Sequence, residues 1–305
     1  MEKHRKKLIK NATVFDGHSS GLAQGKKIVI EDDIVTEITA DEVSEENFDE
    51  VFDGTGMVAM PGMTDAHVHM GCLFAKGEFP VDYATVLTVA KCKDALMAGF
   101  TTFRDAGSVS EGLKLAFDEG VLLGPRIYPC GAYISQTCGH GDSEYAHTYR
   151  DIQYRHPSST ALADGVPEII RAVREQFYRG ASHIKLTATE ILNRHEDIRL
   201  LFGTDMMITG TDYQVEQSED IRYYEKRFGT MRALRALTGT ANEVFALTTY
   251  QNPYPKGKIG VLEAGSYADL LLVDGDPTKS VSVLADTDHL RLIMKGGTVY
   301  KNTLC

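Results

Sequence analysis

The residues with the clearest chemistry are two histidines, His67 and His69, with Asp65 two positions before them. In a β-strand alternate side chains share a face, so these three would point one way while residues 66, 68 and 70 point the other. Imidazoles that close together suit zinc, iron, nickel or a similar divalent ion, and a nearby carboxylate would set the ligand geometry. The alternative is a pair of surface histidines on an edge strand. A Pro-Gly break before the stretch and a glycine after it indicate a short strand that ends in a loop.

Two further side chains are candidates because of where they lie in predicted strands. Lys185 shares a face with His183 in a strand predicted for residues 182–187, so its ammonium points either to solvent or into the interior. An unpaired inward ammonium would be costly, which leaves the direction open from the residues alone. Asp205 ends an apolar strand predicted for residues 200–205, where the simple alternative is a turn or cap residue.

Two of these stretches resemble motifs of the metal-dependent amidohydrolase superfamily. Residues 61–69, Pro-Gly-Met-Thr-Asp-Ala-His-Val-His, are similar to its first-strand signature, and residues 202–205, Phe-Gly-Thr-Asp, to its eighth-strand motif. Lys185 matches the position of a lysine that CO2 converts to a metal-bridging carbamate. The resemblance implies a (β/α)8 TIM-type barrel that hydrolyses amide and related bonds with one or two metal ions. It implies the ligand set His67, His69, carboxylated Lys185 and Asp205, with Asp205 also accepting a proton from the attacking water.

Within the superfamily the chain resembles the prolidase-like and imidazolonepropionase-like subgroup, which includes Xaa-Pro and Xaa-Arg dipeptidases. The resemblance lies in residues 124–128, 134–142 and 252–255, together with Lys185. It implies a small substrate such as a dipeptide, and it makes His140 a candidate contact for the peptide carboxylate or the scissile carbonyl. The alternative for His140 is a loop histidine in solvent.

The composition argues against some classes of binding partner. Acidic residues outnumber basic ones 43 to 32, giving a net charge of -11, so nucleic acid is not expected as a partner. We also expect no membrane partner, because the sequence has no apolar stretch near the length of a span. The five cysteines are odd in number and form no CxxC pair. They predict reduced thiols and a cytoplasmic location.

The two ends of the chain read as short alternating strands, at residues 12–15, 27–30 and 34–38 and again at 268–273 and 292–300, the last a hairpin about Gly296 and Gly297. Aided by the resemblance, we predict that residues 1–58 and 254–305 form one β-sandwich. Residues 59–253 would form the barrel, because strands and helices alternate there. Further strands are predicted at residues 101–107 and 126–131, and helices at 83–98, 111–119, 168–179, 219–228 and 230–237.

The spacing within the barrel does not allow eight strands. Only 20 residues separate Lys185 from Asp205, whereas four strand-helix units need on the order of 120. The barrel is therefore predicted to be incomplete, internally truncated near residues 189–196 and without strands five to seven. The resemblance then implies that the two histidines holding a second metal are missing, since neither His183 nor His195 matches their motifs. One divalent ion is expected, with zinc preferred.

The truncation leaves two interpretations of function. The first is a hydrolase that cleaves a C–N bond of a small substrate with a metal-activated water. The second is a catalytically inactive remnant that acts as a scaffold or has no function. In both, strand eight should lie beside strand one, strand four should be an edge, and the open edges should favour self-association. The sequence does not determine the substrate side chain, the metal, the carboxylation of Lys185 or the oligomeric state.

Overall fold

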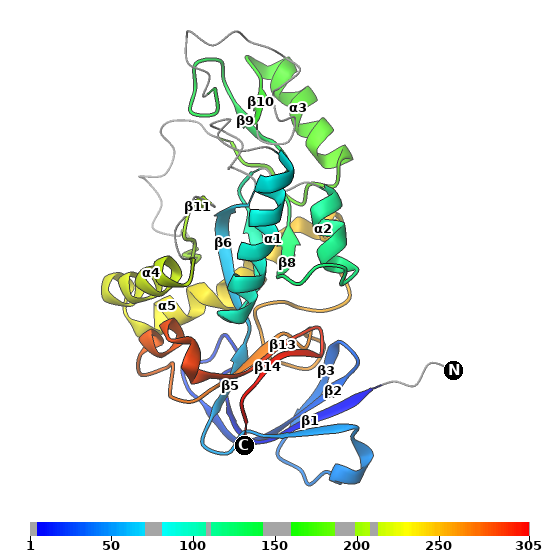
Figure 1. Cartoon of the computed structure of the whole chain (residues 1–305), viewed down its shortest axis with the longest axis vertical. Coiled ribbons are helices and arrows are strands. Elements are labelled where there is room, and N and C mark those ends of the chain that lie inside the picture. The colour runs from blue at the N-terminus through cyan, green and yellow to red at the C-terminus, as the bar shows by residue number, and fades with distance from the viewer. Residues whose placement is uncertain are drawn as a thin grey trace.

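The computed structural model describes residues 5–70, 81–107, 111–142, 160–186, 199–207 and 213–304. The chain is elongated, with a β-sheet built from its two ends at one extreme, a layer of parallel strands and helices in the middle, and a short helix-and-strand unit at the other extreme (Figure 1). The strands are β1 (Lys6–Val14), β2 (Ala23–Glu31), β3 (Ile34–Thr39), β4 (Glu50–Asp53), β5 (Val58–Pro61), β6 (Met63–His69), β7 (Phe100–Asp105), β8 (Arg126–Tyr128), β9 (Tyr133–Ser135), β10 (Thr160–Leu162), β11 (Met206–Met207), β12 (Leu270–Val273), β13 (Leu290–Lys295) and β14 (Thr298–Asn302). The helices are α1 (Val81–Met97), α2 (Glu111–Asp118), α3 (Val166–Tyr178), α4 (Tyr213–Phe228), α5 (Thr230–Leu237) and α6 (Gly239–Phe245), with 3-10 turns at Glu45–Asn47, Ala246–Gln251, Val281–Ala285 and Thr287–His289.

The two ends of the chain form one sheet, with strand order β14-β13-β12-β5-β1-β2-β3 and β4 paired to β1. The predicted hairpin is confirmed: β13 and β14 are joined by Gly296 and Gly297, whose φ angles of 53° and 70° glycine adopts at no steric cost. β5 pairs with both β1 and β12, and it leads directly into β6. The sheet therefore reaches Pro61 and is joined to the parallel layer by a single glycine. The division of the chain into two domains at residues 58 and 254 stays a prediction.

The middle layer contains parallel strands in the order β11-β6-β7-β8. The prediction that strand eight lies beside strand one is confirmed, because Met206 and Met207 pair in parallel with Val68 and His69. Within the described residues the four strands form an open path. The seam predicted near residues 189–196 lies outside the described residues, as do His195, Cys72 and Cys305.

Two of the predicted strands are wrong over most of their length. The segment 182–186 makes one isolated bridge, between Leu186 and Ile134, because it leaves Pro129 at its start and reaches β9 at its end instead of following one neighbour. Residues 200–205 contain no strand residues, and the strand begins only at Met206. The reason is local: Phe202 and Asp205 still bond to the backbone of β6, but the left-handed φ of 53° at Asp205 interrupts regular pairing.

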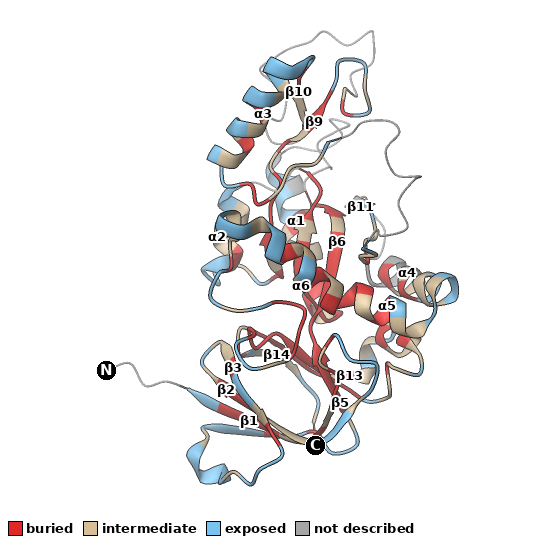
Figure 2. Cartoon of the chain, turned by 180° about the vertical axis from the view of Figure 1, so that it is seen from behind, coloured by how far each residue is buried: buried red, intermediate tan, exposed pale blue. Residues whose placement is uncertain are grey.

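The two sheets share one hydrophobic core, seen as the buried residues at the junction in Figure 2. Phe100 and Phe202 from the parallel layer belong to the same buried cluster as Leu271 and Leu290 from the terminal sheet. Arg126 at the start of β8 adds a buried ion pair across the junction, with its Nε 2.8 Å from an oxygen of Asp269. This packing fixes the amino-terminal ends of β6, β7 and β8, and it thereby supports the carboxyl ends of the same strands.

None of the helices in the described part of the chain is long and apolar enough to cross a membrane.

Candidate metal centre

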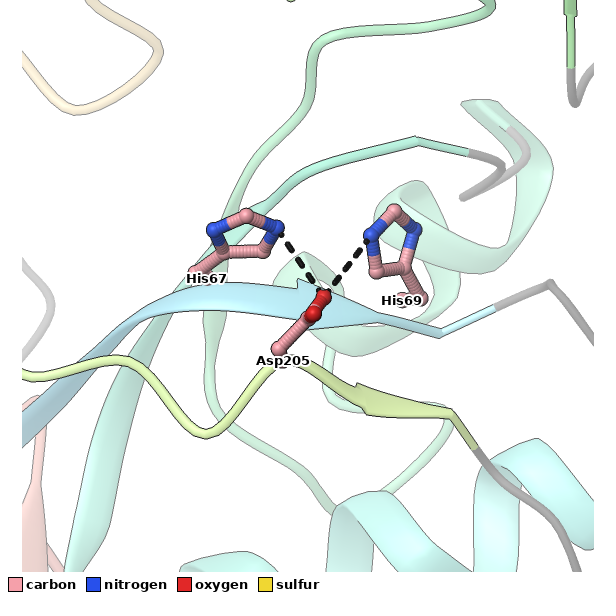
Figure 3. Close-up of side chains that lie close together, drawn as sticks. All are labelled: His67, His69 and Asp205. Atoms are coloured by element: carbon pink, nitrogen blue, oxygen red, sulfur yellow. Dashed lines mark ion pairs between the residues drawn. The ribbon is translucent and has the colours of Figure 1, made fainter. Parts of the chain in front are cut away.

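The described residues hold one group of three side chains that could bind a metal ion, His67, His69 and Asp205. One oxygen of Asp205, Oδ1, lies 3.2 Å from Nε2 of His67 and 3.4 Å from Nε2 of His69. Figure 3 shows the carboxylate between the two imidazoles. All three ligand atoms lie within 4.8 Å of one another. A two-histidine, one-carboxylate set at this spacing fits a divalent transition-metal ion.

The backbone explains why these side chains meet. His67 and His69 are two residues apart near the end of β6, so both project from one face. The chain before β11 runs beside β6, where the amide of Asp205 donates to the carbonyl of His67 at 2.8 Å. Asp205 has a left-handed φ of 53°, a conformation that aspartate tolerates better than most residues. Uncommon backbone of this kind is often found where a functional side chain must be aimed.

Lys185 also reaches the two histidines. Its Nζ lies 2.9 Å from Nε2 of His69 and 3.2 Å from Nε2 of His67. The amine of Lys185, whose direction the sequence left open, therefore points inward to the histidines. The structure brings together all four residues that the sequence predicted as metal ligands, while the role of each as a ligand stays a prediction.

Burial keeps the two imidazoles neutral at neutral pH. It lowers the pKa of His69 to about 4, with the charge of Lys185 as the next cause. The pKa of His67 is lowered by the same two causes, and the charge of Asp205 only partly offsets them. Because a neutral imidazole offers its lone pair, both histidines are in the protonation state that metal binding requires.

Asp65 does not join the cluster, although strand alternation placed it on the same face as the histidines. Its carboxylate is fully buried and accepts hydrogen bonds from the amide and hydroxyl of Thr204, at 3.2 and 2.8 Å, and from the amide of His67. Its pKa is raised to about 7, mainly by burial. The pairing of β6 with β7 shifts register between Asp65 and Val68, which accounts for the broken alternation. Asp65 thus fastens the stretch before Asp205 to β6.

Sequence reasoning missed Tyr133, an aromatic wall of the site. Its ring lies edge-on to that of His69, with centroids 6.3 Å apart, and Nζ of Lys185 lies 5.6 Å from its centroid. A Cβ on Gly107 would come within 2.5 Å of this ring, so the glycine leaves space for it. No sequence signal marked Tyr133, because its place depends on packing against a residue 26 positions away.

His140, the predicted substrate contact, is exposed on the loop after β9. The loop is folded by hydrogen bonds from the amide of Cys138 to Asp142 and from the amide of Gly141 to the hydroxyl of Ser135. The charge of His140 is the smallest of the contributions to the lowered pKa of His69. Substrate contact by His140 stays a prediction.

These pKa values predict acid instability of the metal-free protein. His69 and His183 have folded pKa values of about 4 and about 3, against 6.5 for an unperturbed histidine, so below pH 6.5 the unfolded chain binds more protons. Asp65 acts in the opposite direction, because its pKa of about 7 lets the folded chain hold an extra proton above pH 3.8. The extra proton on folded Asp65 offsets the proton missing from one of the two folded histidines, and the proton missing from the other histidine is not offset. We therefore expect the melting temperature to fall as the pH is lowered from about 6.5 to about 4, and a flat or rising curve would contradict this account.

Comparisons with known proteins relate part of this chain to one family of enzymes. A model of the amidohydrolase family matches residues 58–198. Ochratoxinase from Aspergillus niger is 34% identical over 152 residues, a stretch that covers 43% of this chain and 31% of that enzyme. A 5-methylthioadenosine/S-adenosylhomocysteine deaminase from Dictyoglomus turgidum is 34% identical over 70 residues, which is 23% of this chain and 16% of that one. The chain thus matches about a third or less of the length of these curated relatives.

Solved structures extend the likeness to nearly the whole fold. A prolidase complexed with N-methylphosphonate-L-proline superposes with a TM-score of 0.81 at 22% identity, covering 97% of this chain and 100% of that one. A Xaa-Pro dipeptidase with bound methionine gives a TM-score of 0.75 at 20% identity, with the same coverage. A. niger ochratoxinase gives 0.76 at 18% identity, covering 99% and 96%. Residues 58–198 of this chain thus match the amidohydrolase family, and the fold has prolidases and Xaa-Pro dipeptidases among its structural neighbours.

Proposed function

We propose that this protein is a metal-dependent amidohydrolase that cleaves the C–N bond of a small amide or peptide, such as a dipeptide. The observation that carries the proposal is the meeting of His67, His69 and Asp205 within 4.8 Å, with the histidines near the carboxyl end of β6 and Asp205 just before the neighbouring parallel strand β11. In barrels and related parallel α/β folds, that edge is where active sites lie. The substrate class draws support from prolidase and Xaa-Pro dipeptidase neighbours of similar fold.

The donor set fits one zinc ion, for which His67, His69 and Asp205 would be the ligands. Lys185 would add a fourth ligand as a carbamate, and its Nζ lies at a suitable place beside both histidines. When bound, such an ion supplies a lowered pKa for a water molecule and polarises a carbonyl. We propose one ion per chain, because no further group of three ligating side chains occurs in the described residues.

The protein's own groups would handle the protons and the substrate. The side chain of Asp205 is 74% exposed, so an incoming water can reach the carboxylate. Asp205 would accept the proton of the attacking water and pass it to the leaving amine. His140 would hold the carboxylate or the carbonyl of the substrate from the adjoining loop. Tyr133 would cover the apolar side of the bound molecule.

A panel of Xaa-Pro and Xaa-Arg dipeptides tests this function. Protein loaded with zinc should release free amino acids from at least one of them, and removal of zinc by a chelator should abolish the release. Correctly folded, zinc-loaded protein that cleaves none of the panel would favour the second interpretation, an inactive remnant of the family.

We further propose that the chain self-associates. In the described residues the parallel sheet ends at β8 on one side and at the two-residue β11 on the other, and edges of this kind offer unpaired backbone groups to a second copy. Sedimentation at micromolar concentration should show a species heavier than 33.6 kDa. A monomer that melts cooperatively would contradict this prediction.

A further inference from the structure

His183 is half-buried, lies two residues before Lys185 and is not part of the proposed ligand set. Its Nε2 lies 3.0 Å from the backbone carbonyl of Asp105, the last residue of β7. Its Nδ1 lies 3.0 Å from the hydroxyl of Ser182. Since a carbonyl can only accept, Nε2 carries the hydrogen, and Nδ1 of the neutral ring is an acceptor. The single hydrogen of the Ser182 hydroxyl is shared between Nδ1 and the carbonyl of Pro129, which also lies 3.0 Å away. Burial together with the charge of Arg104 lowers the pKa of His183 to about 3, which agrees with a neutral ring.

The segment that carries Lys185 needs such an attachment, because regular pairing does not hold it. The amide of Ser182 donates to the carbonyl of Pro129 at 2.7 Å, and the carbonyl of Lys185 accepts from the amide of Ile134 at 2.9 Å. Between these two points the chain bends at Ser182 and His183. The imidazole of His183 bridges this bend to β7.

The place where His183 attaches is next to the place that Lys185 reaches. Asp105 pairs with Val68, the residue between His67 and His69. The side chain of His183 is attached at the end of β7, and the side chain of Lys185 points to the histidines at the end of β6. These two strand ends are paired neighbours. Attachment of His183 to β7 therefore limits how far, and in which direction, the side chain of Lys185 can extend.

We propose that His183 is a positioning residue, which holds the bend against β7 and thereby directs the amine of Lys185 to His67 and His69. The purpose of this role rests on the proposed metal-dependent function, but the orientation of Lys185 can be measured without it. The attachment is specific, because Nε2 of the ring donates to the carbonyl of Asp105 at the end of β7.

Trace acetylation of the metal-free protein, read by mass spectrometry, measures how freely the amine of Lys185 leaves the histidines. In His183→Leu, which cannot donate, acetylation of Lys185 should be about tenfold faster than in the wild type. The exposed Lys256 in the same chain should react at an unchanged rate. His183→Gln keeps a donor and should return Lys185 close to the wild-type rate.

Tyr254→Phe is the matched control for loosening of the fold, because it removes a buried hydroxyl that accepts from the amide of Ile127 and donates to Asp118. It should lower the melting temperature and leave Lys185 acetylation unchanged. If His183→Leu does not fold, His183→Asn gives the same test, because its shorter amide cannot reach the carbonyl. An unchanged rate in a folded His183 variant without the donor, or an equal increase in Tyr254→Phe, would overturn the proposal. A wild type that cleaves no dipeptide but shows the expected acetylation pattern would refute the proposed function alone.

Discussion

Asp205→Asn is expected to lower kcat by about a thousandfold or more while the chain keeps its fold. The amide cannot accept the proton of the attacking water, and transfer of that proton by a positioned side chain is worth about 10²–10⁴ in rate. The substitution also removes the only negative ligand among the three described residues that lie together. Because the Asp205 side chain is 74% exposed, its loss should cost little stability.

The measurement is kcat and KM on the best dipeptide of the panel, together with a melting curve. Asp288→Asn is the matched control, because it neutralises an exposed aspartate in the 3-10 turn before β13, and it should leave both quantities unchanged. An Asp205→Asn protein that keeps a tenth or more of the wild-type kcat would show that another group accepts the proton.

Gly203→Ala is expected to damage the site without replacing any of the proposed ligands. A Cβ at this position would lie 2.7 Å from Cβ of His67 and 3.2 Å from its backbone nitrogen. Since neither neighbour can move freely, the stretch that carries Asp205 must shift away from β6. Overpacking of this kind costs about 1–3 kcal/mol. Disturbing the support of a ligand typically weakens metal binding by about 10–100-fold.

Gly112→Ala provides the control for this change. Gly112 lies in α2, where an added Cβ meets nothing within 4 Å, so the alanine should be neutral or slightly stabilising. Zinc affinity and melting temperature are measured for both variants. Zinc affinity equal to wild type in Gly203→Ala would mean that close contact between residues 203 and 67 does not position Asp205.

The residues of the site were predicted from the sequence more accurately than the secondary structure around them. The strand with His67 and His69 follows from alternation and from the breaks that frame it, and β6 confirms it. Lys185 and Asp205 came from resemblance to family motifs, and both lie at the histidines. These residues could be found because motifs record the chemistry that a site needs, and the order of parallel strands brings their ends together.

The parts that could not be predicted depend on contacts between distant residues. Asp65 turned toward Thr204 because β6 has an irregular register against β7, which no local pattern records. The strand predicted at residues 200–205 is interrupted by the left-handed backbone of Asp205. The segment predicted as a strand at residues 182–187 is instead attached to β7 by the side chain of His183. Tyr133 reached the site through packing beside Gly107. For Asp65, His183 and Tyr133 the determining partner is far away along the chain, so propensity and periodicity do not record it.

Titration of the metal-free protein with zinc, followed by calorimetry, tests the central claim most directly. We expect one tight equivalent per chain, lost when His67 and His69 are both replaced by asparagine and kept when the described but uninvolved His289 is replaced. Two tight equivalents, or tight binding that survives the loss of both His67 and His69, would contradict the account.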